Sequence, residues 1–184
     1  LSDGGNLQAL MDAAKITGWK VDSRLYTVSP YLPVEGGWQE FLYSKSSNFR
    51  YTLKRREKRL QKDGLKLDIR FISSDMLDQQ IINDMAIIEA NSWKSEAGTT
   101  KMQNDSDIAF YRDFLQGFAQ NNWLNIWMGY LNDKPVAYLI NFDYDNKIWF
   151  YNGAYDNTAN QYSIGSILTH YAVKDAFMRN KREY

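Results

Sequence analysis

Cysteine is absent from the 184-residue sequence, and histidine occurs only once. The chain can therefore form no disulfide, use no cysteine nucleophile and build no Cys/His zinc site, so we expect no metal cofactor. The absence of cysteine also fits a reducing compartment, and we expect a cytoplasmic protein. No apolar run approaches the roughly 18 residues that a membrane-spanning helix needs, so we expect no membrane span.

Charge is balanced overall but unevenly placed. The sequence is 44% hydrophobic and 15% aromatic, enough for one globular core, and its formal net charge is zero. Residues 45–62, however, hold eight lysines or arginines against one glutamate, a net charge of about +7. The spacing of apolar residues predicts a helix over residues 46–62, capped by Ser46, Ser47 or Asn48.

This basic helix has two interpretations. Its charge would attract the phosphates of a nucleic acid, a nucleotide-bearing ligand or an anionic membrane. Alternatively, it is a solvated amphipathic helix whose long basic side chains cover apolar surface. We favour the second interpretation, because the basic face carries no aromatic residues on which bases could stack. We therefore do not expect nucleic acid as a partner.

Three stretches rich in β-branched and aromatic residues follow one another closely, at residues 124–131, 136–144 and 148–155. The connections between them are so short that they permit only antiparallel pairing. The middle stretch carries apolar residues on both sides, with Val136 expected on the side of Tyr138. We therefore expect helices on both faces of the sheet.

Apolar periodicity predicts further elements around this meander. They are a strand over residues 65–72, helices over residues 75–93 (capped by Ser73 or Ser74) and 105–120, a helix after Ser163, and a strand opening at Glu183 and Tyr184. The order from residue 65 is β-α-α-β-β-β-α-(β), an α/β (α+β) fold with a mixed sheet.

The first 36 residues read as the end of an upstream unit. Residues 7–16 have a helical pattern, and residues 19–28 alternate like a strand. Gly36 and Gly37 mark a boundary. We therefore divide the chain into a terminal part of an upstream half-domain or linker, residues 1–36, and a main domain, residues 37–184.

The turn after the third meander strand is a candidate anion site. Ser163 precedes an apolar helical pattern and reads as its N-cap. A helix start leaves main-chain N–H groups without partners and concentrates positive dipole, which suits a phosphate or pyrophosphate. Gly165 would let ligand oxygens approach the main chain closely. Many capped helices bind nothing, so a purely structural turn stays open as the alternative.

Four motifs in a fixed order carry a family resemblance over residues 38–184. They are Arg50…Leu53-Lys54-Arg55…Lys58-Arg59-Leu60…Gly64, Ser92-Trp93-Lys94…Gly98-Thr99, Asn132-Asp133-Lys134-Pro135-Val136-Ala137 and Tyr155-Asp156…Tyr162-Ser163-Ile164-Gly165-Ser166-Ile167-Leu168. The chain resembles GNAT-superfamily acyltransferases, in particular the CelD-like subgroup of cellulose biosynthesis. That subgroup is distantly related to the Fem-type aminoacyl ligases.

The resemblance implies a GNAT-like domain that continues past residue 184, preceded by the end of a first GNAT-like half. It also implies acyl transfer from acetyl-CoA or another acyl-CoA to the amine or hydroxyl of a small-molecule acceptor. The donor's pyrophosphate would bind Gln161, Ser163, Ile164, Gly165 and Ser166. Ile164 stands where the family usually has proline, and its glycine-rich phosphate pattern is only partly present.

The resemblance also suggests catalytic and acceptor-binding residues. Tyr155 and Asp156, at the end of the third meander strand, are the catalytic candidates, with Asp156 as general base. The alternative for Asp156 is a turn aspartate bonded to its own backbone. Trp93 and Lys94 are the substrate-binding candidates, or else a buried tryptophan beside a solvated lysine. His170 lacks a nucleophile elbow and reads as a packed or surface histidine.

Three functions follow from these observations. The first is an acyl-CoA-dependent N- or O-acyltransferase that acts on a polysaccharide or cell-envelope precursor. The second is a Fem-like aminoacyltransferase, in which the basic helix approaches a charged tRNA. The third is a catalytically inactive GNAT-like scaffold in polysaccharide synthesis. The oligomeric state is not predicted.

Overall fold

The computed structural model describes residues 5–21 and 29–184. It divides the chain into two compact units, Leu1–Leu32 and Pro33–Tyr184. In the first unit, the predicted helix is present as α1 (Gly5–Ile16), and Gly18, whose φ of 75° is left-handed, follows its C-terminal end. The strand predicted over residues 19–28 falls largely outside the described residues. The assignment of residues 1–36 to an upstream half stays a prediction.

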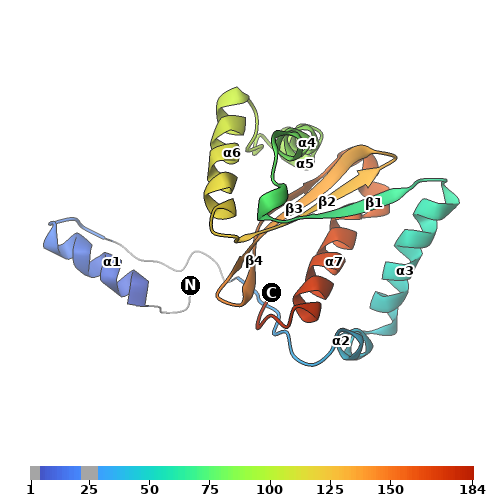
Figure 1. The fold of residues 1–184 in the computed structure, drawn as a ribbon, viewed down its shortest axis with the longest axis horizontal. Helices are drawn as coiled ribbons and strands as arrows, with labels where there is room; N and C mark the ends of the chain where they lie inside the picture. Colours follow the sequence, from blue (N-terminus) through green and yellow to red (C-terminus); the bar gives the residue numbers. More distant parts are fainter. Residues whose placement is uncertain (1–4, 22–28) are drawn as a thin grey trace. The chain divides into compact units, whose positions relative to one another are not determined.

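The second unit is built on a four-stranded antiparallel sheet in the order β1-β2-β3-β4 (Figure 1). Both hairpins that join the last three strands turn through two residues with positive φ, Asn132-Asp133 and Asp145-Asn146. This is the chemistry of a type I′ turn, whose twist matches that of the sheet. The predicted meander is confirmed, with strands β1 Leu67–Ile72, β2 Leu124–Leu131, β3 Lys134–Tyr144 and β4 Lys147–Tyr155.

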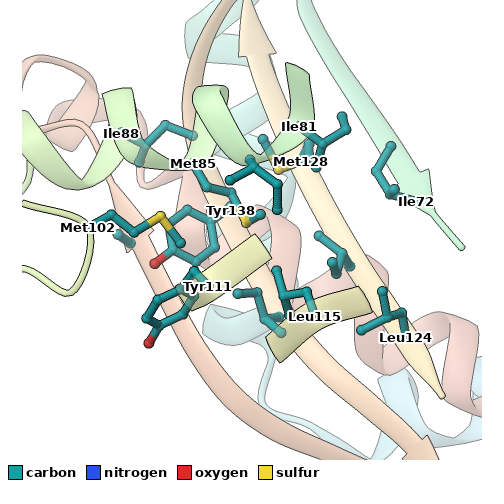
Figure 2. Packing of buried hydrophobic residues seen from close by; sticks show 14 of the residues in the cluster. Ile72, Ile81, Met85, Ile88, Met102, Tyr111, Leu115, Leu124, Met128 and Tyr138 are labelled. Carbon is teal, nitrogen blue, oxygen red and sulfur yellow. The ribbon is translucent and has the colours of Figure 1, made fainter. Parts of the chain in front are cut away.

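Helices cover both faces of the sheet, as predicted. Figure 1 shows α4 and α6 on one face and α7 with α3 on the other. Each face has its own apolar core, and Figure 2 shows the first, in which Met85, Leu115 and Tyr138 meet. The helices are α2 Trp38–Ser44, α3 Ser47–Lys62, α4 Gln79–Ala90, α5 Trp93–Glu96, α6 Asp105–Ala119 and α7 Ile164–Met178.

The helix predicted over residues 75–93 is divided into three pieces. A short 3-10 turn, η1 (Ser74–Met76), precedes α4, and the separate turn α5 follows it. The cap at Ser73 or Ser74 was wrong for α4, because Leu77 is extended and Asp78 accepts the Ile81 N–H at 2.9 Å instead. The basic helix, in contrast, is capped by Ser46 as predicted.

Two bulges decide which way side chains of the meander point. In β3, Gly129 faces Ala137 and Tyr130 faces Pro135, so Val136 is the extra residue. Val136 packs in the core under α7, not on the side of Tyr138 as predicted. In β4, the register skips Tyr151. Such a bulge bends a strand and redirects its side chains, often beside functional sites.

The chain returns to the sheet at its C-terminal end. Glu183 forms a parallel bridge with Lys147, and the Ile148 N–H donates to the Glu183 carbonyl at 2.9 Å. The bridge lies where a further strand was expected to open, but the described residues form isolated bridges there and no strand. Among residues 5–21 and 29–184, none of the helices combines the length and the hydrophobicity that a membrane span requires.

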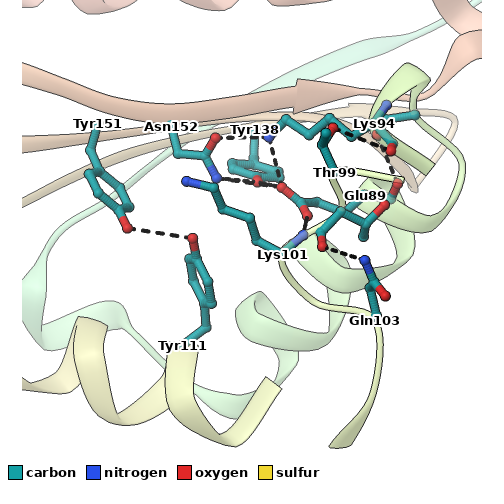
Figure 3. A network of polar contacts seen from close by, with 11 residues as sticks. Glu89, Lys94, Thr99, Lys101, Gln103, Tyr111, Tyr138, Tyr151 and Asn152 are labelled. Atoms are coloured by element: carbon teal, nitrogen blue, oxygen red, sulfur yellow. Dashed lines mark hydrogen bonds and ion pairs between the residues drawn. The ribbon is translucent and has the colours of Figure 1, made fainter. Parts of the chain in front are cut away.

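A buried polar cluster lies between the helices and the middle of the sheet (Figure 3). We call it the Glu89 cluster, after the fully buried carboxylate at its centre. Glu89 Oε1 accepts from Lys94 Nζ at 2.8 Å and from the Tyr138 hydroxyl, while Oε2 accepts from the Lys101 main-chain N–H at 2.6 Å. Lys94 Nζ also donates to Asn152 Oδ1 at 2.8 Å. The cluster therefore ties α4 and α5 to β3 and to the bulged part of β4.

The cluster keeps its carboxylate ionised. Burial alone would raise the pKa of Glu89, but hydrogen bonds from Lys94, Tyr138 and the Lys101 N–H outweigh it and lower that pKa below its usual range. Removing one partner of this buried pair is costly, because the other charge is then left uncompensated in the interior.

We predict that Lys94→Met lowers the free energy of unfolding by about 3–5 kcal/mol, because it leaves Glu89 buried without its cation. Adding Glu89→Gln to that variant should recover much of the loss. Urea denaturation measures both values. The matched control is Arg182→Met, which breaks the exposed Arg182–Asp145 pair and should cost less than about 1 kcal/mol. An equal loss in Lys94→Met and Arg182→Met would contradict this account.

The lowered pKa of Glu89 also predicts a pH dependence. The pKa of this carboxyl is lower in the folded state than in the unfolded state, where it is about 4.3. Its contribution to folding stability is therefore fully present above the unfolded pKa and is lost as the pH falls through the folded pKa. Urea midpoints measured between pH 7 and pH 3 should therefore fall below about pH 4.5. Glu89→Gln should flatten that decline, and an unchanged slope in this variant would refute the assignment.

Candidate functional site

A cleft of about 340 Å³ opens where β4 ends and α7 begins. Two glycines help to keep it open. A Cβ atom at Gly153 would lie 3.1 Å from the Tyr138 carbonyl oxygen and 3.2 Å from Leu139 Cδ1, and one at Gly165 would lie 3.5 Å from the Tyr155 ring. The cleft is lined by Tyr138, Leu139, Phe150, Gly153, Ala154, Tyr155, Asn160, Ser163, Gly165, Ser166 and Thr169.

The turn into α7 presents main-chain donors to this cleft. Ser163 is left-handed, with φ 53° and ψ 45°, and its carbonyl accepts the N–H groups of Ser166 at 3.0 Å and Ile167 at 3.2 Å. The N–H groups of Ile164 and Gly165 have no acceptor among the described residues. Two open donors at the positive end of a 15-residue helix form a favourable place for an anion.

Ser163 does not cap α7 with its side chain, contrary to our expectation. A capping serine is extended, with its hydroxyl turned back over the first helical N–H groups. Ser163 instead ends the 3-10 turn η2 (Asn157–Tyr162) in the left-handed region, where its hydroxyl cannot take that position. The consequence favours ligand binding: a capping hydroxyl would accept from the N–H of Gly165 or Ser166, and without it the Gly165 N–H stays open.

The predicted donor-binding residues fall into two groups. Ser163, Gly165 and the exposed Ser166 line the cleft, and Ile164 buries its side chain beneath it. Gln161 lies outside the lining, where its Oε1 accepts from Arg59 Nη2 at 3.0 Å. The structure thus brings four of the five predicted residues together at the turn, and holds the fifth against α3.

Asp156 is fully buried at the start of η2. One carboxylate oxygen accepts from the Thr158 N–H at 2.8 Å and from its hydroxyl at 2.6 Å, and the other accepts from Lys134 Nζ at 3.2 Å. Burial alone would raise the pKa of Asp156, but the hydrogen bonds from Thr158 and Lys134 lower it. This environment disfavours proton abstraction, because both oxygens are engaged and the carboxylate is weakly basic. The assignment as general base stays a prediction.

Tyr155 lies half-buried in the cleft, with its ring beside Gly165. It therefore belongs to the end of the cleft at the α7 turn, away from the bulge at Tyr151. His170 packs edge-on against Trp38, with ring centroids 5.0 Å apart, and burial lowers its pKa. A packed histidine is what the sequence indicated.

The structure reverses the environments that the alternative for Trp93 and Lys94 assumed, a buried tryptophan beside a solvated lysine. Trp93 is 48% exposed, whereas Lys94 is only 7% exposed and belongs to the Glu89 cluster. Trp93 is therefore free to stack on a ligand, and Lys94 is not free to bind one. Sequence reasoning did not single out Glu89 or Asn152. Glu89 stands four residues after Met85 on the apolar face of α4, a spacing that could have indicated a buried carboxylate.

Comparison with known proteins gives the family. A family model described as an acetyltransferase (GNAT) domain matches residues 47–184, three quarters of the chain. Comparison with curated proteins finds no match.

Solved structures show only weak likeness. PaiA N-acetyltransferase from Thermoplasma acidophilum, in complex with coenzyme A, is 14% identical with a TM-score of 0.47, over 63% of this chain and 75% of that chain. A possible acetyltransferase from Clostridium difficile 630 is 16% identical with a TM-score of 0.41, over 57% and 67%.

The family model accounts for α3, the whole sheet and α7 in one match, and its residues include every lining residue of the cleft. The expected fold class and the expected class of enzyme are thereby confirmed. The chain belongs to the acetyltransferase (GNAT) domain family.

Proposed function

We propose that this chain binds an acyl-CoA in the cleft between β4 and α7 and transfers its acyl group to an amine or hydroxyl. The observation that carries the proposal is the pair of open N–H groups of Ile164 and Gly165 at the start of α7. A pyrophosphate offers oxygens that such donors bind, in the field of the helix dipole. The glycine at 165 leaves room for these oxygens beside the Tyr155 ring.

The open edge of β4 supports the same ligand. The Asp156 N–H donates to the Val136 carbonyl at 2.8 Å, so the main-chain groups of Gly153 and Tyr155, which alternate with it, point away from β3. In the described part of the chain, that side of β4 is bridged only at Lys147. An extended pantetheine arm carries amides that can pair with this edge, and it would lead from the α7 turn towards the bulge at Tyr151.

The reaction needs alignment more than covalent help. The acceptor's nitrogen or oxygen attacks the thioester carbonyl carbon, the C–S bond breaks, coenzyme A leaves as a thiolate, and the acceptor's proton passes to a base or to that thiolate. Main-chain donors of β4 would stabilise the developing oxyanion. Tyr155 and Asp156 stay catalytic predictions. Tyr155 lines the cleft beside Gly165, whereas Asp156 is fully buried and is not among the lining residues.

We infer a polysaccharide or cell-envelope precursor as acceptor from the resemblance to CelD-like proteins. The exposed indole of Trp93 supports this inference, because an exposed aromatic face suits a sugar ring. A cytoplasmic location fits the acyl-CoA donor.

We predict that acetyl-CoA or a longer acyl-CoA raises the melting temperature. At about one hundred times the dissociation constant, binding adds about 2.7 kcal/mol, or roughly 5–10 °C for a domain of this size. Gly165→Trp should abolish the shift by filling the cleft. The matched control is Gly117→Trp on α6, where an added Cβ meets nothing within 4 Å, and this variant should keep the shift. If no acyl-CoA shifts the wild-type protein, the inactive-scaffold interpretation replaces this proposal.

The Fem-like alternative makes a different prediction. If the basic helix approaches a charged tRNA, the protein should bind tRNA with an affinity that falls steeply between about 50 and 200 mM salt. Filter binding measures this. We expect no such binding, and tight salt-sensitive binding would favour the Fem-like function.

A further inference from the structure

Side chains at the C-terminal end of helix α3 bind the segment that leads into the α7 turn. Arg59 donates through Nη1 to the main-chain carbonyl of Gln161 at 3.2 Å and through Nη2 to its side-chain Oε1 at 3.0 Å. The guanidinium also lies over the Tyr162 ring, 5.7 Å from its centroid. Asp63, the C-cap residue of α3, accepts from the Tyr162 hydroxyl at 3.0 Å. The C-terminal end of α3 thus holds two consecutive residues that are about one hundred positions away in the sequence.

Gln161 and Tyr162 lie between two cleft-lining residues. Asn160 precedes Gln161 and Ser163 follows Tyr162, and both line the cleft. The Ser163 N–H donates to the Asn160 carbonyl at 3.0 Å, which closes the turn around the residues that Arg59 holds. A shift of Gln161 would therefore move Ser163 and, with it, the open N–H groups of Ile164 and Gly165.

The turn needs an external support. Ser163 adopts a left-handed conformation that costs a residue with a Cβ some free energy, so it persists only when the surroundings hold it. Its own side chain makes no capping bond. Arg59 suits this role, because a planar guanidinium can bond a main-chain oxygen and a side-chain oxygen of the same residue at once, and lysine cannot reproduce that fork.

We propose that Arg59 is a positioning residue for the phosphate-binding turn, acting through Gln161 and not by touching the ligand. The inference rests on the proposed function, since it concerns the binding of the donor's pyrophosphate at Ile164 and Gly165. It links one residue of the basic helix to the site, and it makes the rest of that helix's charge unnecessary for donor binding. Recognition of the phosphorylated half of the donor then depends on Arg59, while recognition of the pantetheine half depends on β4.

Calorimetric titration of the full chain tests this with two probes, acetyl-CoA and pantetheine, which lacks phosphates. Arg59→Gln should weaken acetyl-CoA binding by about tenfold, the loss of a charged hydrogen bond, and leave pantetheine binding unchanged. Arg59→Lys should behave like Arg59→Gln, because it keeps the charge but loses the fork. Gln161→Ala should have a smaller effect, because the bond to the main-chain carbonyl survives. The matched control is Lys58→Gln, the same loss of charge at the preceding exposed position, which should change neither affinity more than twofold.

The outcomes distinguish a failure of this inference from a failure of the proposed acyl-CoA binding. If the wild-type protein binds acetyl-CoA but Arg59→Gln binds it equally well, Arg59 has no positioning role and the proposed function stands. Two results would show general electrostatic attraction and overturn the inference. One is that Arg59→Gln weakens acetyl-CoA binding while Arg59→Lys does not. The other is that Lys58→Gln weakens acetyl-CoA binding as much as Arg59→Gln does. Loss of both probes in Arg59→Gln would show a structural role only. If the wild-type protein binds neither probe, the proposed function fails first.

Discussion

The buried carboxylate of Glu89 is the constraint on which the middle of this domain depends. Its two oxygens receive donors from α5, from the loop after α5 and from β3, and Lys94 extends the contact to Asn152 on β4. These segments are up to 63 residues apart in sequence. An ionised group in the interior is tolerated only when its partners are in place, so the cluster holds the bulged part of β4 in one position. That part of β4 forms one end of the cleft in which we place the acyl donor.

At the other end of the cleft, the turn into α7 depends on a conformation that most side chains avoid. Ser163 is left-handed, and this geometry directs its carbonyl to Ser166 and Ile167 while leaving the two preceding N–H groups open. The first N–H groups of any α-helix lack partners within the helix, and here no capping side chain occupies them. Gly165, at the start of the helix, then carries no side chain beside those donors. Strain and absent side chains are common at sites that must receive a ligand's charged oxygens.

The basic helix shows how a composition signal can be correct in kind and mislead in detail. Its charge suggested either phosphate binding or simple solvation, and the sequence favoured solvation. The structure links one of its residues, Arg59, to the turn into α7 through Gln161. Gln161, expected to bind the donor, accepts from that arginine, and its part in donor binding stays a prediction. The carboxylate expected to act as base, Asp156, has both oxygens engaged by Thr158 and Lys134. In each case a residue of another element, Arg59 of α3 or Lys134 of β3, supplies a partner that the sequence did not indicate.

The sequence by itself determined the meander, the basic helix, the order of the elements and the place of the α7 turn, because these depend on local periodicity, turn residues and ordered motifs. Only the tertiary structure decided that Lys94 is buried and Trp93 exposed, that Asp78 and not a serine caps α4, and that Ser163 leaves the α7 donors open. The physical reason is the range of the interactions. Local patterns are set by neighbours within a few residues, whereas burial, ion pairing and the conformation of one strained residue are set by segments that meet only when the sheet has formed.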